Sequence, residues 1–520
     1  MEDFELLIGL CVVAIVLTAA ARRMGAPYPA FLALGGVVLA LVPGVPRFAL
    51  RPDLALALFV APVLLDAAYD ASPRDLKDNW APLFGLVVGA VLLTTLAVAY
   101  VARAFEPTLP WAAAIALGAI VAPPDAAAAT AVLAQVRPPR RIVTILEGES
   151  LLNDASALLI YRVAAGAAVN HGFSAKTLGP TFLLGIAASL VFGPVVARIY
   201  LPLVKRIEDT PSAILAQFVS TFGVWIIADR LGLSPVLAMV SYAIAIARVA
   251  PDLTPARLRV PAYAVWETVV FVANVLAFVL IGMQIRPVFE GLSAGERSRY
   301  LYVAAAVLVT VIVVRIAWVM SYNTAVRLKI RRFGFHPPRP MTAPSVQSGV
   351  AISWCGMRGV VTLAAALALP ASADGTPFPF RNLIVLTAFS VVLGTLVLQG
   401  LTLKPLLRFL ALRDDDPVGR EVDLARERVF EAVMATMGDD MSLTVQAVRE
   451  EYETLLQREV DEHGSGSEWS HFAREDAHRR ALAAARHVMS ALRANATIGD
   501  DAFHAIEEDL DRIEIATFPR

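Results

Sequence analysis

Residues 116–136, ALGAIVAPPDAAAATAVLAQV, and residues 142–161, IVTILEGESLLNDASALLIY, are two apolar stretches that each carry charged residues near the middle. A bilayer core needs about 20 mostly apolar helical residues per crossing, and both stretches are long enough. Because an ionisable side chain is costly inside a bilayer, a carboxylate in such a span points to a functional site. The two stretches therefore predict a helical membrane protein and mark the region where its chemistry should lie.

The composition extends this interpretation to most of the chain. Hydrophobic residues occupy 57% of the 520 positions, and the mean hydropathy of +0.63 is well above that of a soluble globular protein. Both cysteines, Cys11 and Cys355, lie in apolar stretches, so neither a disulfide framework nor a cysteine-based metal site is expected. The first apolar stretch has no basic segment before it and is followed at once by another, which favours a permanent span over a cleaved signal peptide.

The apolar windows and the basic loops together predict the topology. Eighteen Lys and Arg residues fall in one set of alternate loops and nine in the other, which places the N-terminus outside and the C-terminus in the cytoplasm. We therefore predict an all-α polytopic protein of the cell inner membrane or plasma membrane, with about thirteen transmembrane helices. The windows cover roughly residues 5–21, 28–44, 54–70, 82–102, 111–134, 142–166, 177–200, 212–229, 234–250, 263–285, 300–322, 347–370 and 382–408.

A sharp change of charge marks a domain boundary near Arg413. Residues 1–413 carry 33 basic and 21 acidic side chains, whereas residues 414–520 carry 12 basic and 25 acidic ones. We predict a transmembrane domain over residues 1–412 and a small, acidic, helical cytosolic domain over residues 413–520. This second domain holds five of the seven histidines, which either sense pH or are simply solvated surface residues: His463, His471, His478, His487 and His504.

The fifth span should break at its two prolines. Pro123 and Pro124 each lack a backbone N–H, so a helix through them would leave free carbonyls and an exposed helix N-terminus at mid-membrane depth. Asp125 follows directly and is a candidate ligand for an ion. An ordinary proline kink with Asp125 capping the second half-helix is the alternative, and it is compatible with an ion-binding role.

The sixth span offers a second group of oxygens on one helix face. Ser150 and Asp154 are four residues apart, and Glu149 and Asn153 form a neighbouring pair. A hydroxyl and a carboxylate supply the hard oxygens that an alkali cation prefers, and the Asp154 carboxylate can equally take a proton. For Glu149 the favoured interpretation is a buried ion-pair network rather than ion binding.

A cation to balance these carboxylates is available in the twelfth span. Arg358 lies between Gly356 and Gly359, where the glycines make local unwinding easy. Because an unpaired arginine is untenable in lipid, we expect Arg358 to pair with Glu149 or Glu147 and to join the two broken segments.

Other charged residues of the spans have less defined roles. In the third span Asp66 is the deeper of two acids and is expected to supply another oxygen, whereas Asp70 should lie at the cytoplasmic surface. The sequence does not assign partners to Glu267 and Arg315. Arg162 is expected to extend toward the outer face.

Three sequence strings resemble a known family when they are taken in order. EGESLLNDASAL (147–158), ETVVFVANVLAFVLIGMQI (267–285) and MRGVVTLAAALALP (357–370) are similar to the sodium/proton exchangers, the NhaP/NHE-type branch of the monovalent cation/proton antiporters. The resemblance covers roughly residues 5–410. It implies two inverted six-helix repeats with discontinuous helices that cross at the midplane, and a homodimer that works by alternating access.

The resemblance also implies a role for individual residues. It makes Asp154 the essential carboxylate, Asn153 its neutral neighbour, and Glu149 and Arg358 a structural ion pair. The remaining oxygen ligands for Na⁺ would be Ser150, Asp125 and Asp66. This chain departs from the family pattern Thr-Asp-Pro, because it has Pro124, Asp125 and Ala126 there, so K⁺ stays open beside Na⁺ and Li⁺. Asn153 leaves one exchanging carboxylate, which in the family accompanies electroneutral exchange.

The expected function is secondary antiport of Na⁺ against H⁺ with both ions competing for Asp154. A K⁺/H⁺ antiporter and a channel-like sensor that signals through the acidic tail are the alternatives, although no filter sequence favours a channel. A hydrolase built on Ser150 would need a histidine within the membrane, and the spans offer none. We therefore expect no enzyme, no cofactor and no nucleic-acid partner, only cations, protons, lipid and a second subunit.

Overall fold

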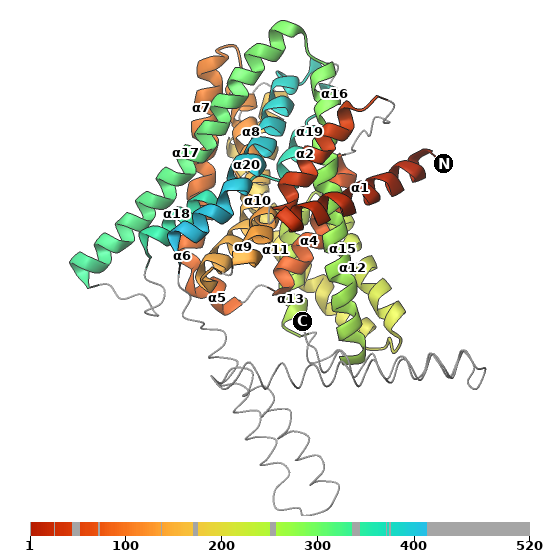
Figure 1. Ribbon diagram of the computed structural model, residues 1–520. Coiled ribbons are helices and arrows are strands. Elements are labelled where there is room, and N and C mark those ends of the chain that lie inside the picture. The colour runs from red at the N-terminus through yellow and green to blue at the C-terminus, as the bar shows by residue number, and fades with distance from the viewer. Residues whose placement is uncertain are drawn as a thin grey trace, which may run out of the picture. The chain divides into compact units, whose positions relative to one another are not determined.

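The computed structural model describes residues 2–24, 27–43, 52–70, 73–136, 138–169, 175–249, 256–334, 344–370, 372–373 and 376–412 (Figure 1). The predicted cytosolic domain, residues 413–520, lies outside the described residues together with its five histidines. Within the described residues the chain is almost entirely helical.

The first half of the chain forms the helices up to the sixth predicted span. They are α1 Glu2–Met24, α2 Tyr28–Leu41, α3 Pro52–Ala55, the π-helix η1 Leu56–Val60, α4 Ala61–Asp70, α5 Pro73–Asp78, α6 Trp80–Phe84, the π-helix η2 Gly85–Ala90, α7 Val91–Phe105, α8 Trp111–Val121, α9 Ala126–Val136 and α10 Arg140–Val169.

The second half contains the other helices and a short hairpin. They are α11 Ala175–Val204, α12 Thr210–Arg230, α13 Pro235–Ala247, α15 Ala256–Met283, α16 Ile285–Glu290, α17 Ala294–Phe333, α18 Val346–Trp354, α19 Val360–Leu367, β1 Ser372–Ala373, β2 Thr376–Pro377 and α20 Arg381–Leu410. β1 and β2 pair antiparallel and form a small hairpin with two residues in each strand. The all-α prediction did not include this hairpin.

Each of the thirteen predicted windows coincides with one helix or with consecutive helices. Two windows are split, one between α8 and α9 and the other between α18 and α19, which are the positions where prolines and glycines predicted a break. Among the described residues, six helical segments are long and apolar enough to cross a membrane on their own, and α17 is the longest at 40 residues. The number of crossings stays a prediction.

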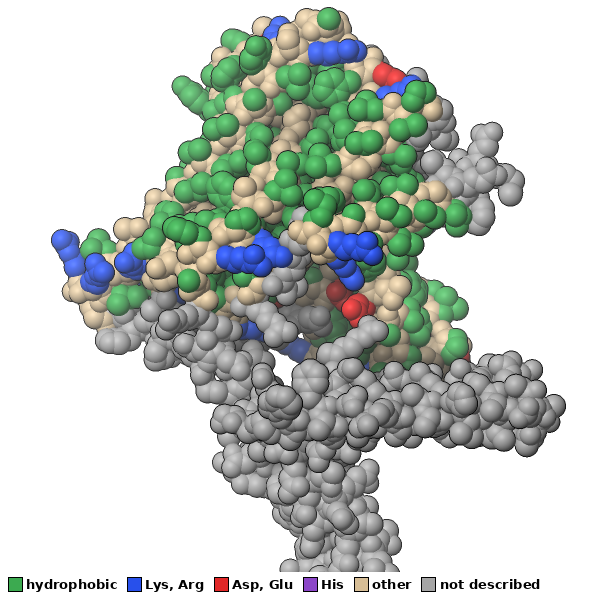
Figure 2. All heavy atoms as spheres, viewed as in Figure 1, with side chains coloured by type: hydrophobic (Ala, Val, Ile, Leu, Met, Phe, Trp, Pro, Cys, Tyr) green, Lys and Arg blue, Asp and Glu red, His purple; other side chains and the backbone are tan. Residues whose placement is uncertain are grey.

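The surface of the helical bundle is apolar. Large hydrophobic side chains are exposed along several helices, among them Val12 on α1, Leu96 on α7, Val191 on α11 and Val219 on α12. Figure 2 shows such side chains over most of one face, with Lys and Arg groups at its upper end and along its lower edge. A soluble monomer rarely exposes so large an apolar area, so this surface fits a multi-pass membrane protein.

Close backbone contacts hold the bundle together where glycines meet. A Cβ on Gly36 of α2 would lie 2.1 Å from the Val279 carbonyl oxygen of α15, and one on Gly282 would lie 2.0 Å from the Ala33 carbonyl oxygen. Small residues at such crossings allow membrane helices to approach closely. Around the broken helices, α8 packs on α7 and α10, and α20 packs on α17, α18, α19 and α9. This packing brings both breaks to the centre of the bundle.

Candidate functional site

The two helix breaks contact each other directly. The backbone N–H of Asp125, in the segment between α8 and α9, donates to the Met357 carbonyl oxygen between α18 and α19 at 2.7 Å. Pro123 and Pro124 end the first helix because they cannot continue its hydrogen-bond ladder. Four half-helix ends therefore converge on one point, two of them with free N–H groups and two with free carbonyls.

Asp125 faces the two N-terminal ends. Its Oδ1 accepts a hydrogen bond of 2.9 Å from the Ala127 backbone N–H, so it caps α9. The same carboxylate lies against the backbone at the start of α19, where a Cβ on Gly359 would fall 1.6 Å from Asp125 Oδ2. A negative group is favourable at a helix N-terminus. Asp125 thus stabilises α9 and α19 together, and a side chain at residue 359 would displace the Asp125 carboxylate.

Arg358 faces the C-terminal end of α8. The side chain is 1% exposed, and its Nε and Nη2 donate to the Val121 and Ala122 carbonyl oxygens at 2.8 and 3.0 Å. Nη1 donates to the Gly356 carbonyl oxygen, and the Arg358 backbone N–H donates to Thr395 Oγ1 of α20 at 3.0 Å. The guanidinium therefore satisfies carbonyls that the break leaves free, at the negative end of the helix dipole.

Glu149 pairs with Arg315 of α17, so the predicted Glu149–Arg358 pair is wrong. Arg315 Nη1 and Nη2 donate to the two Glu149 carboxylate oxygens at 2.6 and 2.9 Å, and the two side chains are 3% and 1% exposed. Arg315 Nη2 also donates to the Ile352 carbonyl oxygen in the last turn of α18 at 3.2 Å. Arg315 therefore has the structural role predicted for Arg358, and it caps the fourth half-helix end as well.

Asn153 and Asp154 of α10 lie beside the first break. Asn153 Nδ2 donates to the Pro124 carbonyl oxygen at 3.0 Å, whereas its buried Oδ1 has no hydrogen-bond partner. Asp154 is 7% exposed, and its carboxylate forms no hydrogen bond or ion pair with any described residue. The Asp154 and Asp125 carboxyl groups lie close enough to interact electrostatically. The two carboxyl groups and the Asn153 Oδ1, which accepts no hydrogen bond, are together suited to bind a positively charged ion.

The other predicted ligands are placed less centrally. Ser150 is half-buried one turn before Asp154, and Asp66 is half-buried on α4, which packs against α10. Glu147, the other predicted partner of Arg358, is exposed, and the Asp70 side chain lies outside the described residues. The set of ligands stays a prediction.

The arrangement suits a small monovalent cation or a proton. Within the described part of the chain no group of three His, Cys, Asp or Glu residues could hold a metal ion, so a resident transition-metal site has no support there. Carboxylate and amide oxygens are hard ligands, which bind alkali cations and not soft metals. Asp154, which lies in the bundle interior, offers such oxygens.

The charges without assigned partners have different surroundings. Arg162 is exposed; its Nη1 donates to the Leu233 carbonyl oxygen at 3.3 Å, and its Nη2 lies 3.8 Å from Asp229. Glu267 is exposed on α15. Arg381, which sequence reasoning missed, donates from Nε and Nη2 to the Leu369 and Leu367 carbonyl oxygens at 3.0 and 3.1 Å, at the end of α19. Arg381 directly follows a segment rich in Phe and Pro, and nothing in that sequence indicates that its side chain binds backbone carbonyls.

The amino-acid sequence is similar to those of several known proteins. The profile of the family described as sodium/hydrogen exchanger, transmembrane, matches residues 10–409. An uncharacterized Na⁺/H⁺ exchanger of Mycobacterium tuberculosis is 30% identical over 457 residues, covering 86% of this chain and 83% of that protein. A sodium, potassium, lithium and rubidium/H⁺ antiporter of Bacillus subtilis is 29% identical, covering 80% of this chain and 63% of that protein.

A solved structure shares the fold. The sodium proton antiporter MjNhaP1 from Methanocaldococcus jannaschii, determined at pH 8, is similar with a TM-score of 0.58 at 18% sequence identity. The match covers 79% of this chain and 99% of that one. The two proteins therefore share an overall helical fold.

Proposed function

Because this chain belongs to the sodium/hydrogen exchanger family and is thus a cation/proton antiporter of a membrane, we propose that it exchanges Na⁺ for H⁺ at Asp154. The observation that carries the proposal is the buried Asp154 carboxylate without a partner among the described residues, next to the unpaired Asn153 Oδ1 and across from Asp125. A buried charge needs a compensating ion or a proton. Loss of the proton therefore requires entry of a cation.

The proposed cycle uses one carboxylate for both ions. On one side of the membrane Asp154 releases a proton and binds Na⁺, with Asn153, Asp125, Ser150 and Asp66 as the other oxygen ligands. The breaks then carry the site to the other side by alternating access, where Na⁺ leaves and a proton returns. Because Asn153 is neutral, Asp154 alone exchanges, so one proton moves against one monovalent cation and the cycle is electroneutral.

K⁺ is the second candidate cation. Pro124 stands where the family has a threonine, which removes a hydroxyl from the neighbourhood of the site. The Bacillus subtilis relative is named for four alkali cations, Na⁺, K⁺, Li⁺ and Rb⁺. We propose Na⁺ as the principal substrate with K⁺ and Li⁺ as weaker ones, and a transporter rather than an enzyme or a channel.

The orientation and assembly also belong to the proposal. The excess of Lys and Arg in alternate loops supports an extracellular N-terminus and a cytoplasmic acidic domain over residues 413–520. The family resemblance supports a homodimer whose subunits each contain a complete site. The membrane would be the cell inner membrane or plasma membrane.

Proton flux in sealed vesicles tests the proposal. The purified protein is reconstituted with a pH-sensitive dye inside, a proton gradient is set, and Na⁺, K⁺ or Li⁺ is added. We expect Na⁺-driven proton flux that Asp154→Asn abolishes, while Asp229→Asn, which changes an exposed carboxylate, keeps the wild-type rate. Equal flux by Asp154→Asn and wild type would refute the assignment.

Two further readouts separate the details. If both ions compete for one carboxylate, the apparent affinity for Na⁺ falls as the pH is lowered, because protons occupy Asp154. An imposed membrane potential should leave the rate unchanged, since an electroneutral cycle moves no net charge. A transport rate that depends on the membrane potential would contradict the one-for-one stoichiometry, but it would not contradict the role of Asp154.

A further inference from the structure

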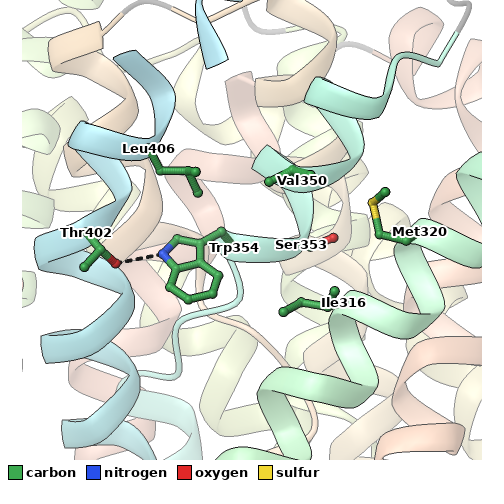
Figure 3. A pocket seen from close by; sticks show the side chains of 7 residues that line it. All are labelled: Ile316, Met320, Val350, Ser353, Trp354, Thr402 and Leu406. Atoms are coloured by element: carbon green, nitrogen blue, oxygen red, sulfur yellow. Dashed lines mark hydrogen bonds between the residues drawn. The ribbon is translucent and has the colours of Figure 1, made fainter. Parts of the chain in front are cut away.

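An apolar cavity lies between α17, α18 and α20, apart from the ion site. It has a volume of about 310 Å³, at the lower end of the range that small-molecule sites occupy. Figure 3 shows Ile316 and Met320 of α17 on one side, Thr402 and Leu406 of α20 on the other, and Trp354 of α18 between them. Most lining side chains are apolar, namely Ile316, Met320, Val350 and Leu406, so the cavity suits a hydrocarbon chain.

Two hydrogen bonds fix side chains of the cavity lining. Trp354 Nε1 donates to Thr402 Oγ1 at 2.9 Å, and Ser353 Oγ donates to the Gly349 carbonyl oxygen at 2.7 Å. These bonds use the polar groups of the lining internally, which leaves methyl, methylene and ring carbons toward the space. Because Thr402 is exposed and Trp354 only half-buried, the cavity opens to the lipid-facing side of the bundle.

The ends of the same helices are strongly basic on one side. Residues 316–333, 346–354 and 398–410 contain six Lys or Arg residues and no Asp or Glu. Arg327 and Arg331 follow Met320 by seven and eleven residues, which places them on its face of α17, about 10 and 16 Å further along the helix. Neither arginine forms a hydrogen bond or ion pair within the described part of the chain. Arg327 is half-buried and Arg331 is exposed, so a negative group can reach both.

We propose that this cavity holds an acyl chain of an anionic phospholipid whose phosphate contacts Arg327 and Arg331. The polar headgroup region lies just outside the hydrocarbon core, which is the direction in which the two arginines follow the cavity. Long arginine side chains reach such headgroups while their stems stay on the apolar surface. The apolar cavity matches the acyl chain of an acidic lipid, and the two arginines match its negatively charged headgroup. A zwitterionic lipid has no net negative charge and would match only the cavity.

Native mass spectrometry of the full-length protein tests the proposal. Detergent-purified protein is incubated with phosphatidylglycerol or phosphatidylcholine that carry the same acyl chains, and bound lipid is counted per chain. Each Lys or Arg near an anionic surface contributes enough that two contacts predict about a thirty-fold preference for phosphatidylglycerol. Arg327→Gln/Arg331→Gln should remove this preference, whereas Arg332→Gln, on another face of α17, should keep it.

A variant that fills the cavity provides the second arm. Leu406→Trp places a ring in the space and should abolish binding of both lipids, while Leu401→Trp, an exposed position on the same helix, should bind as wild type does. Size-exclusion profiles and Na⁺-driven proton flux check that each variant is folded.

Three results would overturn the proposal. The first is lipid binding by Leu406→Trp equal to that of Leu401→Trp. The second is equal binding of the two lipids by the wild type. The third is no bound lipid together with a carbodiimide cross-link from Lys329 to an acid within residues 413–520, which would assign the groove to the chain's own acidic segment.

Discussion

Glu149 pairs with Arg315 and not with Arg358 as the sequence predicted, and this pairing gives the sharpest test of the structure. Arg315 and Glu149 form a bidentate pair at 2.6 and 2.9 Å, and both side chains are almost fully buried. Removing one partner of such a pair leaves an uncompensated buried charge and costs about 3–5 kcal/mol. We therefore expect Glu149→Gln and Arg315→Met each to destabilise the protein by about this amount.

The double variant separates pairing from other losses. When both charges are removed no buried charge is left alone, so Glu149→Gln/Arg315→Met should be more stable than the sum of the single effects predicts. Interacting neighbours show coupling energies of about 0.5–3 kcal/mol, and the geometry of this pair places it near the upper end. The Ile352 carbonyl oxygen, which loses Arg315 in both backgrounds, cancels from the cycle.

Reversible unfolding in mixed micelles, followed by circular dichroism as sodium dodecyl sulfate is titrated, measures the four free energies. The matched cycle replaces Arg315→Met by Arg358→Met, and its coupling should stay below about 1 kcal/mol because Arg358 donates to backbone carbonyls. A larger coupling in the Arg358 cycle than in the Arg315 cycle would refute the pairing seen here.

Three further predictions follow from the breaks and from one helix cap. Arg358→Met removes all three charge-assisted bonds from the guanidinium to carbonyls, so the same titration should show a loss of about 3 kcal/mol or more. Gly359→Ala places its Cβ onto Asp125 Oδ2, so proton flux should fall sharply, whereas Gly223→Ala meets open space and should transport normally; equal rates would contradict the contact. Asp209 Oδ2 accepts a hydrogen bond of 2.9 Å from the Ser212 backbone N–H, and hydrogen bonds from the Ser212 side chain and backbone lower the pKa of the exposed Asp209 from its ordinary value. Because a lowered folded-state pKa gives stability that is present above the unfolded value and lost as the pH falls through the folded one, Asp209→Ala should lower the melting temperature at pH 7 but not near pH 2.

The sequence predicts the breaks because their causes are local. Pro123 and Pro124 lack N–H groups, and Gly356 and Gly359 tolerate backbone that other residues resist, so both interruptions can be located without tertiary information. The helix limits are less well determined: α17 runs from residue 294 to 333, although its apolar window covers only 300–322. Polar helix ends that extend beyond the lipid carry no hydropathy signal.

The partners of the buried arginines could not be predicted from the sequence. Arg315 and Arg358 are both arginines of apolar spans, and the choice between them depends on which face of α17 meets α10. Charge-pair reasoning also searches for a carboxylate, whereas Arg358 is satisfied by Val121, Ala122 and Gly356 carbonyl oxygens. Every residue has a backbone carbonyl, so the sequence does not indicate which carbonyl oxygens will accept a hydrogen bond from a buried arginine.

The capping of α8 by Arg358 has a consequence for how the protein is made. Val121 precedes Arg358 by 237 residues, and at about 5–20 residues per second the ribosome delivers the arginine on the order of ten to fifty seconds after the carbonyls it will cap. During that interval the end of α8 has no guanidinium and cannot rest in hydrocarbon. Water or the insertion machinery must therefore shield the end of α8 until Arg358 has been synthesised, so this part of the bundle can be completed only after α18 and α19 have been made.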